Sequence, residues 1–321
     1  MSRGDLLARW SAPPVAPEST PRYVLRKVLR HAYWARTEGI GRLVEEDRLD
    51  PRERVGSALR KALWRRRSGG LPGSTRPVYV VGLQRSGTNM LLRGLDAAPQ
   101  IEARGENDRE LFERFRLRDR DTLAAAVRRS RHHLVLIKPI CDSHRVDLLL
   151  DDPLLPHGRA LWVVRDVVER ARSEVSKFGP ANLIALRDIA AGRGELRWQG
   201  ERLPSASVEL VRSFDTESMT SHTAAALFWV VRNQLVFDLG LDARDDVLLV
   251  SYDAFAADPE SEMRRICTFL DFPFRPELCA HVTRRSTHGH KPLDIDPRVL
   301  ALAHGLEKRL TRLREQQGMA S

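Results

Sequence analysis

The stretch VYVVGLQRSGTNMLLRGL, from Val78 to Leu95, constrains the fold of this chain more than any other segment. Four apolar or aromatic residues run into Gly82, a short polar loop follows, and Gly87 and Thr88 precede an apolar-rich stretch. This order predicts a buried strand, a tight loop and a helix. In that layout the amides of the loop converge on one point at the positive end of the helix, so the segment predicts an anion site.

The rest of the chain repeats this alternation of short apolar runs and helical segments. We expect strands at 78–81, 134–137, 161–164 and 247–250. The helices are expected at 88–97, 109–117, 121–130, 167–178, 222–239, 259–271 and 297–316. Strands separated by helices predict an α/β fold, with a P-loop-like parallel β-sheet flanked by helices on both faces. Ligands of such sheets bind beyond the carboxyl ends of the strands.

The first 76 residues differ from the body in charge. They hold 17 Lys and Arg against 8 Asp and Glu, whereas the remainder holds 36 against 35. We expect residues 1–76 to form a basic helical extension with a flexible start, and 77–321 to form the functional domain. Within that domain, 179–221 is polar and less regular, which favours a substrate-covering insert.

Two basic helices are expected in the extension, at about 22–44 and 52–67. In the second, an apolar stripe recurs at helical spacing, which predicts that this helix packs on the body. The stripe consists of Val55, Ala58, Leu59, Ala62 and Leu63. A basic arm for a membrane surface or nucleic acid is the alternative.

Composition limits the function classes. The net charge is +10 and the hydrophobic content is 42%, enough for a sizeable core. No apolar run reaches eighteen residues, so we expect no transmembrane helix, and the first residues lack the apolar core of a signal peptide. The three cysteines, Cys141, Cys267 and Cys279, have no metal-type spacing. A cytoplasmic chain without disulfides is therefore expected.

The residues of the polar loop restrict the kinds of ligand that it can bind. An ATP or GTP loop has a lysine directly after its second glycine, but here Thr88 follows Gly87 and the loop's cation is Arg85. A forked guanidinium suits phosphate or sulfate oxygens, while the missing lysine argues against ATP hydrolysis. Asp166, after the strand at 161–164, could still hold Mg²⁺, so a nucleotide-dependent kinase remains an alternative.

The segment GLQRSGTNMLLRGL resembles the 5′-phosphosulfate loop of bacterial-type sulfotransferases that use 3′-phosphoadenosine 5′-phosphosulfate (PAPS). LWVVRDVVERARSEVSKFG resembles the 3′-phosphate element of the same family, a strand-end Arg followed eight residues later by Ser, here Arg165 and Ser173. VLLVSYDAFAADPESEMRRICTFLDFPF resembles a third family segment, which places Tyr252 near the adenine. The resemblance spans about 78–274, and it implies that the donor is PAPS and that no metal is needed.

The resemblance also implies a set of site residues. Lys138 matches a lysine that reaches the sulfuryl group, and Arg85 would assist it. Many relatives have a histidine base where this chain has Ile140, so a glutamate is expected instead: Glu106 first, then Glu102, with His144 as a third candidate. The residues expected to bind PAPS are Gly82, Gln84, Arg85, Ser86, Gly87, Thr88, Asn89, Arg165, Ser173, Tyr252 and Arg285.

The implied activity is transfer of a sulfuryl group from PAPS to a hydroxyl or amine of a small molecule, lipid or carbohydrate. The second product is adenosine 3′,5′-bisphosphate (PAP). Besides the kinase, a non-enzymatic protein that binds membranes or nucleic acid through its basic helices is an alternative. The near-neutral body argues against a nucleic-acid partner. Peripheral membrane contact through the basic helices stays open, as do the acceptor and the oligomeric state.

Overall fold

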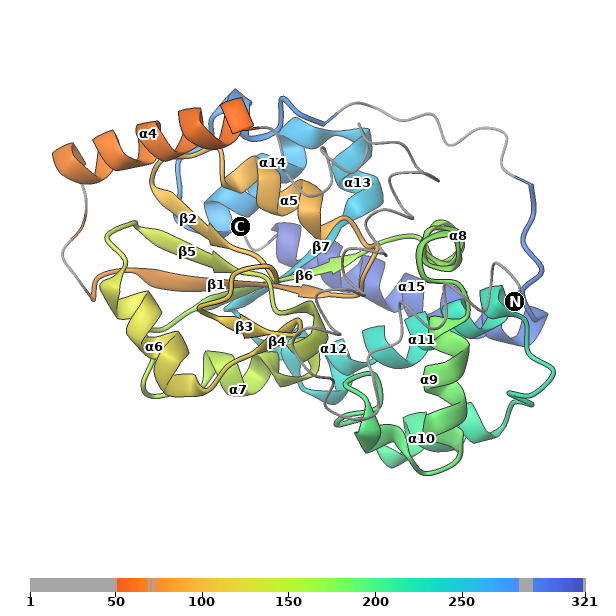
Figure 1. The fold of residues 1–321 in the computed structure, drawn as a ribbon. Coiled ribbons are helices and arrows are strands. Elements are labelled where there is room, and N and C mark those ends of the chain that lie inside the picture. Colours follow the sequence, from red (N-terminus) through yellow and green to blue (C-terminus); the bar gives the residue numbers. More distant parts are fainter. Residues whose placement is uncertain (1–50, 69, 71–72, 283–290, 320–321) are drawn as a thin grey trace.

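The computed structural model describes residues 51–68, 70, 73–282 and 291–319. At the centre of this part lies a parallel sheet with the strand order β2-β5-β1-β6-β7 (Figure 1). The strands are β1 (Arg76–Gly82), β2 (Ile101–Arg104), β5 (Leu134–Ile137), β6 (Arg159–Val164) and β7 (Val247–Ser251). The predicted α/β fold is confirmed, and the four predicted strands are all present.

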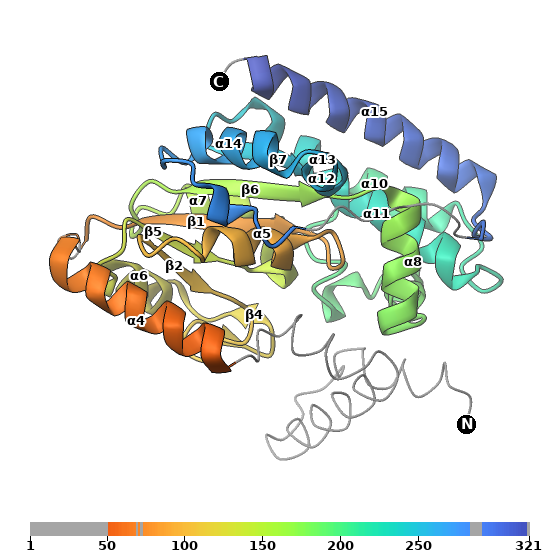
Figure 2. The same ribbon diagram turned by 90° about the horizontal axis from the view of Figure 1, so that it is seen from above.

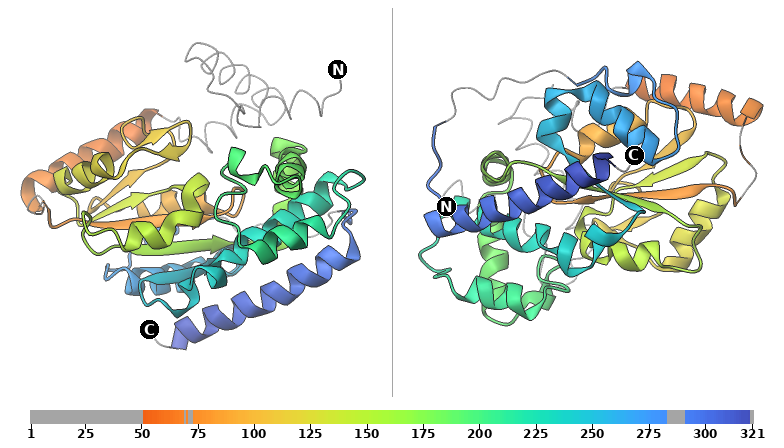
Figure 3. Two further views of the ribbon diagram at one scale, coloured as in Figure 1. Left: turned by 90° about the horizontal axis from the view of Figure 1, so that it is seen from below. Right: turned by 180° about the vertical axis from the view of Figure 1, so that it is seen from behind.

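Helices cover both faces of this sheet (Figures 1 and 2). One face carries α4 (Pro51–Ser68), α5 (Thr88–Leu95), α13 (Tyr252–Ala257) and α14 (Pro259–Phe269). The other carries α6 (Arg120–Arg129), α7 (Val146–Leu150), α8 (Val167–Phe178), α11 (Ser221–Asn233) and α12 (Leu235–Asp238). The last helix, α15 (Pro297–Met319), runs along α11 and past the edge strand β7 (Figure 3). Within the described residues, no helix is both long and apolar enough to cross a bilayer.

Two hydrophobic clusters hold the sheet between these layers. In β1, Val78 and Val80 belong to the cluster with α5 and α14, whereas Tyr79 and Val81 belong to the cluster with α6 and α11. Strand side chains alternate between faces, so a strand that is apolar throughout must be covered on both. Burying each such side chain contributes about 1.5–3 kcal/mol. The central strand β1 is thereby held firmly, and so is the loop that leaves its carboxyl end.

The segment 109–117 is not a helix, contrary to the sequence-based prediction. It contains a hairpin of β3 (Phe112–Glu113) and β4 (Arg116–Leu117). The two residues between these strands, Arg114 and Phe115, have φ angles of 52° and 72°. Consecutive positive φ angles form the two-residue turn that suits a hairpin. Asn-Gly usually marks such a turn, and Arg-Phe carries no comparable signal.

The insert 179–221 is more regular than predicted. It contains α9 (Ala181–Ala190), the short helix η2 (Gly194–Leu196) and α10 (Ser205–Arg212), and α9 packs on both α10 and α11. The helix predicted at 222–239 is divided at Gln234 into α11 and α12. Helix α9 is apolar and half of its residues are buried, whereas α10 buries only Ser207 and Val211, and the polar residues around these two short helices hid them.

Helix α4 packs on the body, but through a different face from the predicted one. Leu59 and Leu63 of the apolar stripe are 60% and 52% exposed. The packed face instead holds Trp64, which stacks on His132 with ring centroids 5.6 Å apart, and Lys61, which pairs with Asp96. The face that packs on the body is therefore the one that carries the Trp64 indole and the Lys61 ion pair, and not the one with the two leucines. The predicted helix at 22–44 and the candidate Arg285 lie outside the described residues.

Candidate active site

Residues predicted to be functional follow the carboxyl ends of all five parallel strands. β1 leads into the loop 83–87, β5 into Lys138, β6 into Arg165 and β7 into Tyr252. β2, which was not predicted, ends at Arg104, two residues before Glu106. Because parallel strands end at one edge of a sheet, the fold brings these groups together. The close packing of β1 between β5 and β6 puts the loop in the middle.

The loop needs glycine at two positions. Gly82 has a φ of 126°, and a Cβ atom there would lie 2.4 Å from the Val163 carbonyl oxygen. Gly87 has a φ of 93°, and a Cβ atom there would lie 2.1 Å from the ring of Tyr252. Any side chain would therefore be strained and would clash. The same contact shows that Tyr252, distant in sequence, packs directly on the loop.

Ser143 holds the start of the loop in place. Its hydroxyl accepts a hydrogen bond from the Gly82 amide at 3.0 Å and donates at 2.9 Å toward the carbonyl oxygens of Gly82 and Ile140. Sequence reasoning did not identify this residue. It belongs to η1 (Ile140–Arg145), a short buried helix directly after Pro139, and a lone serine in such a segment gives no functional signal.

Arg165 extends along the other side of the loop. Its guanidinium lies 4.7 Å from the centroid of the Tyr252 ring and donates to the Arg85 carbonyl oxygen at 3.3 Å. The indole of Trp229 donates to the Arg165 carbonyl oxygen at 2.9 Å, which fixes the strand end. Trp229 is another residue that the sequence did not mark as functional, since a buried tryptophan usually belongs to the core.

Two buried polar atoms at this site have no hydrogen-bond partner among the described residues: the hydroxyl oxygen of Ser86 and Nε of Arg165. Buried polar groups are normally hydrogen-bonded, and leaving one without a partner costs about 1–3 kcal/mol. Together with the glycine turns, these two donors fit an anionic ligand with phosphate groups. The residues present are therefore suited to a nucleotide such as PAPS.

The side chain of Arg85 connects the loop to α8. Its Nε donates to the hydroxyl oxygen of Ser173 at 3.0 Å, although the two residues are 88 positions apart in the chain. The φ of Arg85 is 68°, a left-handed conformation that is uncommon for a residue with a side chain. This backbone conformation sits at the tip of the anion loop, where strain is typical of a ligand site.

Lys138, Glu106 and Asn89 form a second cluster beside the loop. The Lys138 ammonium lies 2.9 Å from Oε2 of Glu106 and donates to Oδ1 of Asn89 at 2.6 Å. The side chains of Lys138 and Glu106 are 10% and 17% exposed. Cys141 lies at the back of this cluster, with its sulfur 4.0 Å from Oε1 of Glu106. Burial raises the pKa of the Cys141 thiol, so it is a neutral packing group here.

The two rival bases lie in other surroundings. Glu102 pairs with Arg104 at 2.6 Å and accepts from the Ser130 hydroxyl at 2.7 Å, at the amino-terminal side of β5. Burial raises the pKa of Glu102, but the bonds from Ser130 and Arg104 outweigh it and leave that pKa below its usual value. A carboxylate held in this way is a weak base, and it lies away from the loop.

His144 is fully buried in a network of charged groups. Its Nε2 lies 2.9 Å from a carboxylate oxygen of Glu201, and its Nδ1 faces Arg232 at 3.2 Å. Burial, followed by the charge of Arg232, lowers the pKa of His144 to about 3. The imidazole therefore stays neutral and serves to tie η1 to the insert through Glu201, and its geometry gives no access for an acceptor.

Asp166, the residue that a metal-dependent kinase would need, caps α8. Its side chain accepts from the Glu169 amide at 2.8 Å. Its own amide donates at 2.7 Å to Asp253. The described residues contain no group of three or more histidine, cysteine or carboxylate side chains arranged to hold a metal ion.

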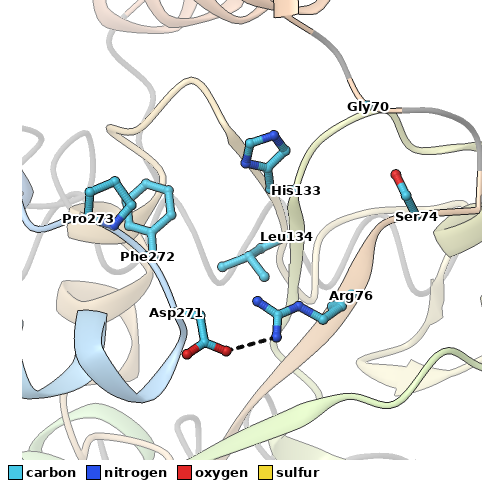
Figure 4. A pocket seen from close by; sticks show the side chains of 8 residues that line it. All are labelled: Gly70, Ser74, Arg76, His133, Leu134, Asp271, Phe272 and Pro273. Carbon is cyan, nitrogen blue, oxygen red and sulfur yellow. Dashed lines mark hydrogen bonds and ion pairs between the residues drawn. The ribbon is translucent and has the colours of Figure 1, made fainter.

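A cavity of about 350 Å³ lies at the opposite edge of the sheet (Figure 4). Its lining includes Arg76 and Leu134, the first residues of β1 and β5, together with Asp271, which pairs with Arg76 at 3.1 Å. No predicted site residue within the described part of the chain lines this cavity. Because it lies at the amino ends of the strands, it is separate from the candidate active site.

Comparison with known proteins adds a family match. A model of the sulfotransferase domain family matches residues 75–290, which is more than half of the chain. No curated protein matches the chain. Similar solved structures include a sulfotransferase from Alicyclobacillus acidocaldarius, with 20% identity and a TM-score of 0.46, covering 75% of this chain and 96% of that one.

Two further structures are similar to this chain at lower identity. The sulfotransferase domain from the curacin biosynthetic pathway has 14% identity and a TM-score of 0.43, covering 74% of this chain and 98% of that one. The sulfotransferase domain of the Synechococcus PCC 7002 olefin synthase has 16% identity and a TM-score of 0.38, covering 76% and 94%.

Proposed function

Since the chain belongs to the sulfotransferase domain family, we propose that it transfers a sulfuryl group from PAPS to a hydroxyl or amine of an acceptor. The observation that supports this best is the meeting of three elements at one sheet edge. These are the glycine loop, the Arg165–Tyr252 pair and the Lys138–Glu106 pair. Together they would bind an anion, place a cation beside an aromatic ring, and supply a base next to a cation.

The donor would lie along this edge with its phosphosulfate on the loop 82–89. The loop amides, the Ser86 hydroxyl and the side chains of Thr88, Asn89 and Arg85 would hold the 5′-phosphosulfate. Gln84 contributes its backbone. Arg165 and Ser173 would hold the 3′-phosphate, and the Tyr252 ring would lie near the adenine. Arg285 stays a prediction for the same phosphate.

The reaction would be an in-line displacement at sulfur. The acceptor oxygen or nitrogen forms a bond to sulfur while the bond from sulfur to the bridging oxygen of the phosphosulfate breaks. Glu106 takes the acceptor proton. Lys138 and Arg85 stabilise the negative charge that develops on the bridging oxygen and leaves with PAP. A transfer of this kind needs no metal ion, because the cations of the protein neutralise the leaving group.

The acceptor would approach from the side of Glu106, beneath the insert 179–221. We propose a small molecule, lipid or carbohydrate with a hydroxyl or amine. The insert is anchored near this point by Glu201, which bonds both His144 and Arg116. The three cysteines are free thiols, which suits a cytoplasmic enzyme.

Calorimetric titration with PAP, with ADP as the control nucleotide, tests this function. We expect PAP to bind at least thirtyfold more tightly, since an arginine–phosphate contact contributes about 2–3 kcal/mol. Equal affinity for the two nucleotides would refute PAPS as the donor. In a companion assay, sulfuryl transfer should persist in excess EDTA, while phosphate transfer from ATP with a strict magnesium requirement would establish a kinase.

A further inference from the structure

Beneath the candidate phosphosulfate loop lies a buried ion pair that the mechanism does not use. Arg170 is 0% exposed and Glu174 is 3% exposed, and Nη2 of the arginine lies 3.2 Å from Oε2 of the glutamate. Both residues belong to α8, one turn apart. Arginine and glutamate are almost never fully buried unless they are paired. A buried ion pair is weak evidence for a contribution to stability, because apolar residues of similar size often serve a core as well.

The arginine makes bonds to three other parts of the fold. Its Nε donates to the Gln84 carbonyl oxygen in the loop at 3.2 Å. Its Nη1 donates to Oδ1 of Asn182 on α9 at 2.8 Å and to the Ala225 carbonyl oxygen on α11 at 3.1 Å. One planar guanidinium therefore connects the loop, α8, the first helix of the insert and the helix that packs against it.

The pair also lies close to the ligand-facing groups of α8. Arg170, Ser173 and Glu174 are spaced at i, i+3 and i+4, so they share one face of the helix. Ser173 on this face bonds Arg85. Burial is the largest influence on the pKa of both Arg170 and Glu174, lowering the first and raising the second, and the charge of Arg85 lowers both. The loop thus rests on a buried, charged support.

We propose that Arg170 and Glu174 are positioning residues: they fix the backbone of the phosphosulfate loop at Gln84 and connect it to α9 of the insert. The inference rests on the proposed function of the loop. The amide of Arg85 belongs to the same planar peptide unit as the Gln84 carbonyl and points the opposite way, so a bond that fixes this carbonyl also fixes the direction of that amide. Glu174 provides the opposite charge at 3.2 Å, and Asn182 hydrogen-bonds both members of the pair.

A double variant tests this role without leaving a charge buried alone. In Arg170→Met with Glu174→Met, the pair becomes apolar at similar volume and no charge is left alone. The carbonyl oxygens of Gln84 and Ala225 and Oδ1 of Asn182 each lose a donor, so we expect a lower melting temperature, and PAP binding is measured well below it. The bond to Gln84 is lost, so the Kd for PAP should rise about tenfold or more. The KM for the donor should rise with it, while the KM for the acceptor changes less.

Two further variants complete the experiment. Arg170→Lys keeps the buried cation but cannot serve all four partners, so it should weaken PAP binding severalfold, and it carries the test if the double variant does not fold. Arg265→Met is the control, because Arg265 is a largely buried arginine whose bonds go to Glu262 on α14 and to the Leu249 carbonyl oxygen in β7. It should lower stability and leave PAP affinity unchanged.

The results separate this inference from the proposed function. If the parent protein does not bind PAP, the proposed function fails. If the parent binds PAP and a folded Arg170 variant binds it within twofold of the parent, the positioning role is overturned and the pair is only a structural element of α8.

Discussion

Replacing Glu106 with glutamine tests the candidate base. The change keeps the size and the hydrogen-bonding shape of the side chain and removes its basicity. Glu106 is 17% exposed and faces the Lys138 ammonium at 2.9 Å. Both side chains of this pair are largely buried, and removing one charge of a buried pair costs up to about 3–5 kcal/mol. The cost is smaller here, because the glutamine oxygen and Oδ1 of Asn89 can still accept from the Lys138 ammonium. The fold and the donor site should therefore survive the substitution.

Turnover should respond much more strongly than stability. Losing a general base slows a reaction by about a hundred- to ten-thousandfold, which corresponds to about 3–5 kcal/mol of transition-state stabilisation. The assay is sulfuryl transfer at saturating PAPS, with PAP binding measured by calorimetry on the same preparation. We expect a Kd for PAP within threefold of the parent, which separates chemistry from binding.

The rival carboxylate provides the matched control. Glu102→Gln removes the charge that pairs with Arg104 and leaves one acceptor oxygen for two donors, Arg104 and Ser130. It should lower the free energy of unfolding by about 1–3 kcal/mol while leaving turnover of the folded enzyme nearly intact. The opposite pattern, with Glu106→Gln active within a few-fold and Glu102→Gln inactive though folded, would refute our reasoning about the geometry.

Three other predictions follow from the structure. Arg165→Ala should reduce the preference for PAP over ADP about thirty- to a hundredfold, measured by calorimetry, and an unchanged preference would remove Arg165 from the 3′-phosphate site. The pKa of His144 is about 3 in the folded state against an ordinary value of 6.5, so the unfolded chain binds a proton first as the pH falls. The free energy of unfolding should therefore be unaffected by this group above pH 6.5 and should decrease by about 2 kcal/mol on going to pH 5. Urea unfolding at several pH values, with His144→Asn as the control variant, checks this, and an equal pH slope in both proteins contradicts it. On α4, Trp64→Ala should lower the free energy of unfolding by about 2 kcal/mol, because the stacking on His132 is lost. Leu63→Ser should change the free energy of unfolding by no more than about 0.5 kcal/mol, because this leucine is exposed. Equal effects of the two substitutions would mean that the leucine face is covered.

Sequence reasoning worked where the information is local. The run from Val78 to Gly82 encodes a buried strand by its apolar side chains, and Gly87 encodes a turn that other residues cannot adopt without strain. The strands at 134–137, 161–164 and 247–250 were predicted for the same reason. The hairpin at 112–117 and the strand β2 were missed. β2 is a short edge strand of sequence IEAR, which pairs with a single neighbour and carries little apolar signal.

The tertiary structure decided which polar residues meet. Glu102 and Glu106 look equivalent in the sequence, but the register of β2 against β5 leaves Glu102 opposite Val135 and brings Glu106 beside Lys138. His144, the third candidate base, is buried against Arg232 and Glu201, a setting that the sequence did not indicate.

The sequence by itself determined the strand–loop–helix unit and the residues at the strand ends, because hydrophobic periodicity and glycine conformation act over a few neighbouring positions. Only the tertiary structure showed that Arg170 and Glu174 are buried under the loop. In the sequence they are two charges one helical turn apart, the usual pattern of an exposed helix face. Burial depends on what packs against that face, here α9, α11 and the loop, and this is set by segments up to 86 residues away in the chain.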